Sequence, residues 1–323
     1  MANKKRGRCR KFLSRETFNK DCLIWFLRPH YYHHEPSDLA TSWFVPAWVL
    51  FLYRLVAFAY ILTITVLKIV FDHRHGKMFI YFTNLNYILL PGYFAVGVTL
   101  GVIYLGHKWG LPLLDEFGDW YYRRGRKADK QERTHLNIVE FIYWIGFPLA
   151  VTNALFLDIV YWAAIFGVEE EEDESRREGF LLFLTINVHA INALWLLGEL
   201  ILTRMDVFFL YIICPIAYGM TYLIFAWIRY AIAENWVYDI LDWDDPVNAV
   251  YYVIIWPIGM ACFLVVMAAT WFRNWVAFKL GRYHRDRTKQ KQETNDKQHQ
   301  QRKEEREMEQ FSVDDDEEEH PQV

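Results

Sequence analysis

Cysteine is scarce in this chain, which has four among its 323 residues: Cys9, Cys22, Cys214 and Cys262. The first two lie in a basic N-terminal segment and the other two lie inside apolar stretches, so a disulfide framework is not indicated. The sequence also has no Asn-x-Ser/Thr triplet, which excludes an N-glycan site. The apolar run at 22–27 is shorter than the roughly 7–15 residues of a signal-peptide core, so we expect no cleavable signal.

Long apolar stretches dominate the middle of the sequence. Hydrophobic residues make up 54% of the chain and aromatic residues 18%, whereas roughly 45–50% apolar residues is usual for a soluble protein. A helix needs roughly 20 mostly apolar residues to cross the hydrocarbon core, where every backbone polar group must be paired within the protein. We therefore predict an all-α, polytopic membrane protein whose six spanning helices lie near residues 46–70, 78–105, 136–166, 180–202, 207–230 and 249–272.

The charged residues predict the orientation of these helices. Lys and Arg gather in the N-terminal segment, in the second loop, at Arg204 and in the C-terminal tail from Arg273 onward, whereas the third loop is acidic at 169–174 and the fifth has no Lys or Arg. Basic loops face the cytoplasm, so we expect both termini there. The polar C-terminal tail has too few apolar residues to form a core and is expected to be disordered or a solvated helix. Three regions follow: a basic cytoplasmic segment at 1–45, the transmembrane domain at 46–275 and the polar tail at 276–323.

Ionisable groups inside the predicted spans are costly in lipid and mark candidate functional positions. They are Arg54, Glu140, Asp158, His189, Glu199 and Arg229. Arg54 and Glu140 are expected to snorkel to an interface or to lie near span ends, and Arg229 lies at the outer end of its span. At 1.5 Å per residue, Thr83 lies roughly 7 Å below the outer end of its span, Asp158 roughly 12 Å and His189 roughly 13 Å.

Thr83, His189 and Asp158 together have the chemistry of a nucleophilic site. A threonine hydroxyl is a poor nucleophile unless a base takes its proton as it attacks, and a neutral histidine is the usual base. Asp158 is a candidate third member that would orient the imidazole. The alternative is structural, because Thr and Asn side chains commonly form hydrogen bonds between transmembrane helices.

Three further residues are candidates for supporting roles. Asn86 lies one turn below Thr83, and Asn192 lies one turn below His189, on the matching helix faces. Glu199 lies roughly 15 Å along the helix from His189, so we expect it to be a hydrogen-bond partner in the inner half of the bundle.

Four short motifs occur in order along the spans: YFTNLN at 81–86, FP at 147–148, NVH at 187–189 followed by Glu199, and WVY at 236–238. They resemble the threonine motif, the Phe-Pro, the histidine helix and the Trp-Val-Tyr of the androgen-induced transmembrane protein family. Their order and spacing agree across residues 43–275. Within that family, the tract from Thr41 to Arg54 and the length are most similar to the rolling stone branch of invertebrates.

The resemblance implies two kinds of function. The androgen-induced proteins are intramembrane threonine hydrolases that cleave esters of branched fatty acids, and their threonine and histidine fall on Thr83 and His189. A fatty-acyl ester would then be the substrate. The rolling stone branch is associated with myoblast fusion, which implies a non-enzymatic alternative in cell–cell contact at the plasma membrane, with an endomembrane location left open. Asp158, Glu199 and Arg229 keep a third class, a channel or transporter, under consideration.

Other patterns bear on partners and cofactors. The lipid bilayer is the expected partner of the spans, and the basic segments are expected to attract anionic inner-leaflet lipids, at about 1 kcal/mol per charge. The cluster of His30, His33, His34 and Glu35 lacks further ligands at zinc-finger spacing, so we expect no metal site and no cofactor. Nucleic-acid binding is not indicated, because the charges flank spans and no recognition motif occurs.

Overall fold

The computed structural model describes residues 36–71, 77–114, 117, 138–165 and 179–282, and within these ranges the chain forms helices and no strands. Six of the helices are long and apolar enough to cross a membrane, which confirms the predicted fold class. The chain divides into two compact units, Met1–Arg273 and Asn274–Val323, and the contacts described below lie within the first.

The six spans differ in how regular they are. Three are uninterrupted α-helices: α3 (Ala47–Phe71), α4 (Phe82–Trp109) and α11 (Asn248–Lys279). The other three contain a π-helical or 3₁₀ segment: α6 (Ile138–Val160) with η4 (Tyr161–Ile165); α8 (Gly179–Ile186), η6 (Asn187–Ile191) and α9 (Asn192–Leu202); and η7 (Phe209–Ile212) with α10 (Ile213–Ala233). Short 3₁₀ turns form η2 (Pro36–Ala40), η3 (Lys77–Ile80) and η8 (Asp239–Leu241).

Local backbone signals move two of the predicted span boundaries. The second span was predicted at 78–105, but residues 77–80 form a 3₁₀ turn and the α-helix starts at Phe82. It continues to Trp109, where Gly110 adopts a left-handed conformation (φ 64°) and ends it. In the fifth span, Glu234 takes the same role with φ 54°, which is uncommon for a residue with a side chain.

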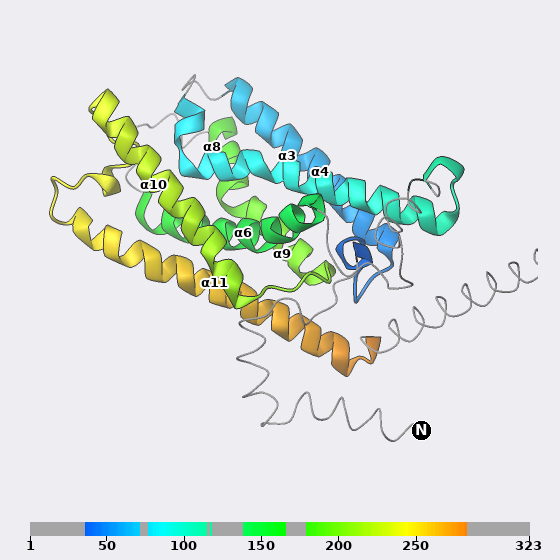
Figure 1. The fold of residues 1–323 in the computed structure, drawn as a ribbon. Coiled ribbons are helices and arrows are strands. Elements are labelled where there is room, and N and C mark those ends of the chain that lie inside the picture. Colours follow the sequence, from blue (N-terminus) through cyan, green and yellow to red (C-terminus); the bar gives the residue numbers. More distant parts are fainter. Residues whose placement is uncertain (1–35, 72–76, 115–116, 118–137, 166–178, 283–323) are drawn as a thin grey trace, which may run out of the picture. The chain divides into compact units, whose positions relative to one another are not determined.

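The packed centre of the bundle lies around α6. In Figure 1, α6 lies between the α3–α4 pair and α10, and it contacts α4, α9 and α10. Its aromatic residues Trp144 and Phe147 are fully buried, as are Phe94 of α4, Leu196 of α9 and Phe263 of α11. Burying these large side chains between helices is what joins the spans into one bundle.

The outward faces of the spans are apolar as well. Val70, Leu89, Ile142, Leu194 and Ile232 are each more than half exposed. A soluble protein rarely leaves large contiguous apolar patches exposed, whereas a bilayer covers such faces with lipid. The chain is therefore an integral, multi-pass membrane protein.

The bundle has two ends, which we name by the predicted orientation. The end that holds Phe71, Phe82 and Ala233 is called the predicted outer end, and the end that holds Ala47 and Leu202 is called the predicted inner end.

Candidate functional site

An apolar cavity of about 130 Å³ lies between α4, α6, α10, α11 and the segment that joins the last two helices. Its walls are mostly aliphatic and aromatic side chains, and no Asp, Glu, Lys, Arg or His occurs among the described residues that line it. An apolar protein cavity of ~150 Å³ stays dry and binds a benzene-sized molecule. The cavity therefore has the size and chemistry to hold a section of an apolar chain.

The cavity extends along the helices rather than across them. Its lining on α6 runs from Thr152 to Val160, which corresponds to roughly 12 Å of helix. This is a little under half of the roughly 30 Å thickness of a bilayer's hydrocarbon core. The cavity thus matches the depth of most of one leaflet.

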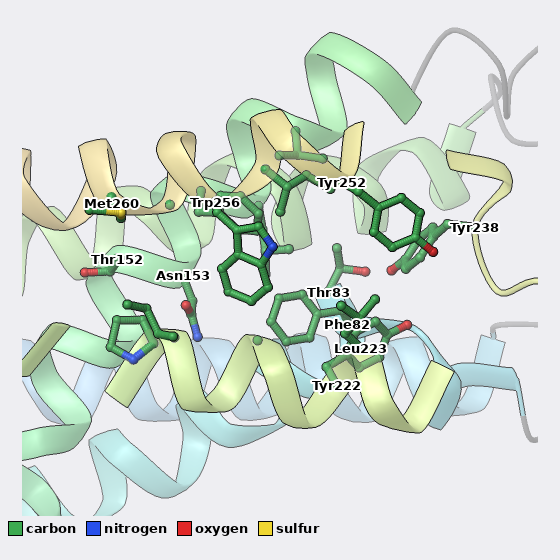
Figure 2. Close-up of a pocket in the computed structure, with 18 of the residues that line it drawn as sticks. Phe82, Thr83, Thr152, Asn153, Tyr222, Leu223, Tyr238, Tyr252, Trp256 and Met260 are labelled. Carbon is green, nitrogen blue, oxygen red and sulfur yellow. The ribbon is translucent and has the colours of Figure 1, made fainter. Parts of the chain in front are cut away.

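Thr83 lies on the cavity wall near the predicted outer end. It is in the first turn of α4, which begins directly after the turn η3, and its side chain is buried (8% exposed). Figure 2 shows Thr83 grouped with Phe82, Tyr222 and Tyr238. The Tyr222 hydroxyl donates a hydrogen bond of 2.8 Å to the Ile80 carbonyl, which joins α10 to the start of α4.

The other end of the cavity also carries polar side chains. Figure 2 shows Thr152 and Asn153 of α6 there, beside Met260 and separated from Thr83 by Trp256. The Asn153 amide nitrogen donates a hydrogen bond of 3.0 Å to the Asn86 side-chain oxygen. Asn86, a predicted supporting residue, therefore links α4 to α6 one turn below Thr83.

His189 has different surroundings from Thr83. It lies in the π-helical segment η6, and its ring stacks on the Tyr161 ring with 3.5 Å between centroids and 8° between planes. The indole nitrogen of Trp162 donates a hydrogen bond of 2.6 Å to the His189 carbonyl. His189 is buried and is not among the residues that line the cavity, although η6 packs against α4, which carries Thr83.

Two π-helical segments meet at this histidine. Tyr161 and Trp162 belong to η4, and His189 belongs to η6. Single π-helical turns inside α-helices are rare and are frequent at functional sites. The segment at the histidine is therefore the most unusual backbone feature of the fourth span.

Asp158 and Asn192 come together beside this segment. Asp158 is half-buried on α6, and its side chain lies near the side chain of Asn192. The Asn192 side-chain oxygen accepts a hydrogen bond of 2.7 Å from the Ala193 backbone N–H. The structure thus brings together Asp158, predicted at the depth of His189, and Asn192, predicted one turn deeper on the histidine helix.

Glu199 belongs to a separate, charged cluster at the predicted inner end. Its carboxylate accepts hydrogen bonds from the Arg54 guanidinium at 3.0 and 2.6 Å and from the hydroxyls of Tyr93 and Tyr143 at 3.3 Å. Arg54 is 1% exposed and also donates a bond of 2.6 Å to the Leu39 carbonyl. The expectation that Arg54 snorkels to an interface is wrong, because Glu199 holds it inside the bundle.

The remaining ionisable groups of the spans also lie in defined surroundings. Glu140 is fully buried, and Arg229 donates a hydrogen bond of 2.6 Å to the Asn235 carbonyl at the end of α10. Arg273 was counted in the sequence as a tail charge, but it is buried. It donates hydrogen bonds of 2.8 Å to the carbonyls of Leu200 and Met205 at the C-terminal end of α9.

Several residues of the site were not found from the sequence. Thr152, Asn153 and Trp256 line the cavity, yet none of them is ionisable, so the cost of charge in lipid does not distinguish them in the sequence. Tyr238 occurs in the WVY motif, which was the one sequence signal that pointed to the segment covering the cavity.

Among the described residues, no group of three or more His, Cys, Asp or Glu is arranged to hold a metal ion. The cluster of His30, His33, His34 and Glu35 and the acidic stretch at 169–174 lie outside the described residues. No family model matches the chain, and no curated protein and no solved structure matches it.

Proposed function

We propose that this multi-pass membrane protein hydrolyses a lipid ester, with Thr83 as the nucleophile and His189 as the base. The observation that carries the proposal is the position of Thr83, a hydroxyl on the wall of an apolar, chain-sized cavity inside a membrane-spanning bundle. An acyl chain held in that cavity would bring its ester group to a side chain that can attack it. The motif resemblance points to the same two residues.

The chemistry would proceed by acyl transfer. The Thr83 oxygen attacks the ester carbonyl carbon while the His189 imidazole takes the hydroxyl proton. The protonated imidazole then gives that proton to the leaving alcohol oxygen as the ester bond breaks, which leaves an acyl-threonine. A water molecule attacks this acyl group, again with His189 as base, and releases the fatty acid and the free threonine.

Two features of the structure support His189 in this role. The segment η6 packs against α4, so the histidine and Thr83 are carried by neighbouring elements. The Tyr161 ring stacks on the imidazole and fixes the plane of the ring. A fixed ring plane is what a general base needs, because proton transfer depends on alignment with the hydroxyl.

Turnover of a fluorescent acyl ester by the purified full-length chain in detergent tests the proposal. Thr83→Ala and His189→Ala are each expected to abolish turnover, while Thr83→Ser retains part of it because a hydroxyl remains. Thr99→Ala is a matched control, since Thr99 is exposed on the same helix and donates its hydroxyl to the Ala95 carbonyl.

Unchanged turnover in both the Thr83 and the His189 variants would remove the hydrolase from consideration. The non-enzymatic role in cell–cell contact, which the likeness to the rolling stone branch implies, would then be the leading alternative. It predicts that exchanging the acidic loops alters cell aggregation, whereas Thr83→Ala leaves aggregation unchanged.

A further inference from the structure

The apolar cavity approaches the lipid-facing surface of the bundle between α10 and α11. Ile216 of α10 and Met260 of α11 both line the cavity, and both are more than a third exposed, at 37% and 44%. On α6, the lining residues Thr152 and Asn153 lie beside Met260 in Figure 2 and are buried, at 1% and 5%. At this level the cavity is therefore closed on the side of α6 and borders lipid on the side of α10.

Ile216 and Met260 lie at the same level on the two helices. Consecutive spans run antiparallel, and Gly219 of α10 faces Trp256 of α11, because a Cβ atom at 219 would lie 3.7 Å from the indole ring. From this pair towards the predicted inner end, Ile216 is three residues away on α10 and Met260 is four residues away on α11. We call the gap between Ile216 and Met260 the portal.

The portal lies near the middle of the membrane. Met260 is twelve residues from Asn248 at the start of α11, which corresponds to roughly 18 Å of helix. The hydrocarbon core is roughly 30 Å thick, and the acyl chains of its two leaflets end at its centre. The portal therefore faces the ends of acyl chains, where no water is present.

Trp256 lies between the portal and Thr83. Figure 2 shows its indole inside the cavity, with Thr83 on one side and Met260 on the other. The part of α11 that carries it is loosely packed, since residues 249–261 are all exposed or half-buried, whereas Cys262 and Phe263 directly after them are buried. A half-buried side chain on such a stretch can change rotamer without a movement of the backbone.

The predicted outer end of the cavity is closed by hydrogen bonds. The segment 234–247, which joins α10 to α11, covers this end. The Tyr252 hydroxyl donates a bond of 2.7 Å to the Leu241 carbonyl, and the Asn248 amide donates to two further carbonyls of the segment at 2.8 and 3.0 Å. Entry from the water side would break such bonds, whereas entry through the portal only displaces apolar side chains.

We propose that the seam between α10 and α11 is a lateral portal, through which an apolar lipid chain enters the cavity from the bilayer, and that Trp256 opens and closes the way from this portal to Thr83. The substrate class is then a lipid dissolved in the membrane, not an ester taken up from water. A cavity of about 130 Å³ holds only a benzene-sized section of a chain. The portal lets the remainder of a longer chain lie in the bilayer.

This inference deepens the proposed function, because it rests on the cavity being the site for a lipid chain. It does not rest on hydrolysis at Thr83. Thr83→Ala is therefore used as the background for the test, so that the probe ester remains intact throughout.

Photolabelling of the full-length chain in phospholipid nanodiscs tests the portal. The probe is the methyl ester of a short diazirine-bearing fatty acid that fits inside the cavity, and mass spectrometry measures the label on residues 152–160 of α6. Ile216→Cys/Met260→Cys, in a chain whose four native cysteines are replaced by alanine, is joined by a short bismaleimide either before or after the probe is loaded. Joining the cysteines first is expected to abolish the label, whereas joining them afterwards should retain it.

Two controls accompany this measurement. N-ethylmaleimide alkylates both cysteines without joining them, so the label should then be independent of the order of addition. Trp256→Ala removes the indole between the portal and the Thr83 end, and it is expected to speed the labelling of residues 82–83. Trp227→Ala should leave that rate unchanged, because Trp227 contacts Tyr252 across the same seam but does not line the cavity.

The possible failures are distinguishable. Equal label in both orders of bismaleimide addition would overturn the portal alone, whereas no label in either order would overturn it together with the lipid-chain site on which it rests. Failure of the bismaleimide to join the pair would refute their opposition across the seam. An unchanged rate in Trp256→Ala would refute the gate; should that variant not fold, Trp256→Phe replaces it, with faster labelling expected and an unchanged rate again refuting the gate.

Discussion

Removing either partner of the Arg54–Glu199 ion pair should destabilise the whole bundle. The two residues are 1% and 0% exposed, and the guanidinium contacts the carboxylate at 2.6 Å. Arg54 comes from α3 and Glu199 from α9, so the pair joins the first and fourth spans. The same guanidinium holds the Leu39 carbonyl of the segment before the first span. Three parts of the chain therefore depend on one pair of charges.

The expected magnitude follows from what each variant leaves behind. Removing one partner of a buried ion pair costs about 3–5 kcal/mol, because the remaining charge is buried without compensation. An arginine keeps its proton in proteins, whereas a carboxyl group can take one up and become neutral. After Arg54→Met, Glu199 still has the hydroxyls of Tyr93 and Tyr143 at 3.3 Å. We therefore expect Arg54→Met to lower the free energy of unfolding by about 3 kcal/mol and Glu199→Leu to lower it by about 5 kcal/mol.

The double variant Arg54→Met/Glu199→Leu separates this account from a purely local packing effect. Replacing a whole buried ion pair by apolar side chains is often neutral or stabilising, so the double variant should lose less stability than Glu199→Leu alone. The assay is the free energy of unfolding in mixed micelles, followed by circular dichroism as sodium dodecyl sulfate is added. Arg229→Met, at a half-buried arginine that donates to the Asn235 carbonyl, is the control and should change the free energy of unfolding by less than about 1.5 kcal/mol. A double variant as unstable as the sum of the two single variants would refute the reasoning.

Three further predictions rest on close contacts. Gly97→Ala would place its methyl carbon 2.6 Å from the Tyr143 hydroxyl and should destabilise the bundle by about 1–3 kcal/mol in the same unfolding assay, whereas Gly92→Ala, with nothing within 4 Å, should not destabilise it. Arg273→Met removes two hydrogen bonds of 2.8 Å to carbonyls at the end of α9 and should cost about 2–4 kcal/mol, which a lowered midpoint of unfolding would show. Tyr161→Leu removes the ring that stacks on the proposed base and should reduce turnover of an acyl ester. Tyr161→Phe keeps the ring and should retain turnover. Equal activity in the two variants would contradict a positioning role for Tyr161.

The sequence predicted the spans well because each span depends on its own composition. Twenty apolar residues in a bilayer have to be helical whatever their neighbours are. The errors at span ends arose from local backbone features, such as the left-handed Gly110 and the 3₁₀ turn before Phe82, that hydropathy does not register. Depth along a helix was also informative, since Asp158 was placed at the depth of His189, one turn above Asn192, and its side chain lies near that of Asn192.

Partners across the bundle were much harder to predict. Arg54 and Glu199 are separated by 145 positions, and nothing in the spacing of either helix specifies that they meet. Two helices at known depth still have to be rotated about their own axes and assigned neighbours before side chains can be paired. Asn86 illustrates the problem, because the sequence placed it one turn below Thr83 without specifying a partner, and its side-chain oxygen accepts a hydrogen bond from Asn153 of α6.

Thr152 marks a further limit of reasoning from sequence. A threonine in a span is ordinarily satisfied by its own helix, so its type and position carry little information. Thr152 and Thr270 differ in the hydrogen bonding of one hydroxyl: the Thr270 hydroxyl donates to the Val266 carbonyl of its own helix, whereas the Thr152 hydroxyl is unbonded among the described residues. Charge made Arg54 and Glu199 conspicuous in the sequence, and both serve to hold the bundle together. The candidate ligand site depends instead on neutral hydroxyls, which only the packed structure separates from the rest.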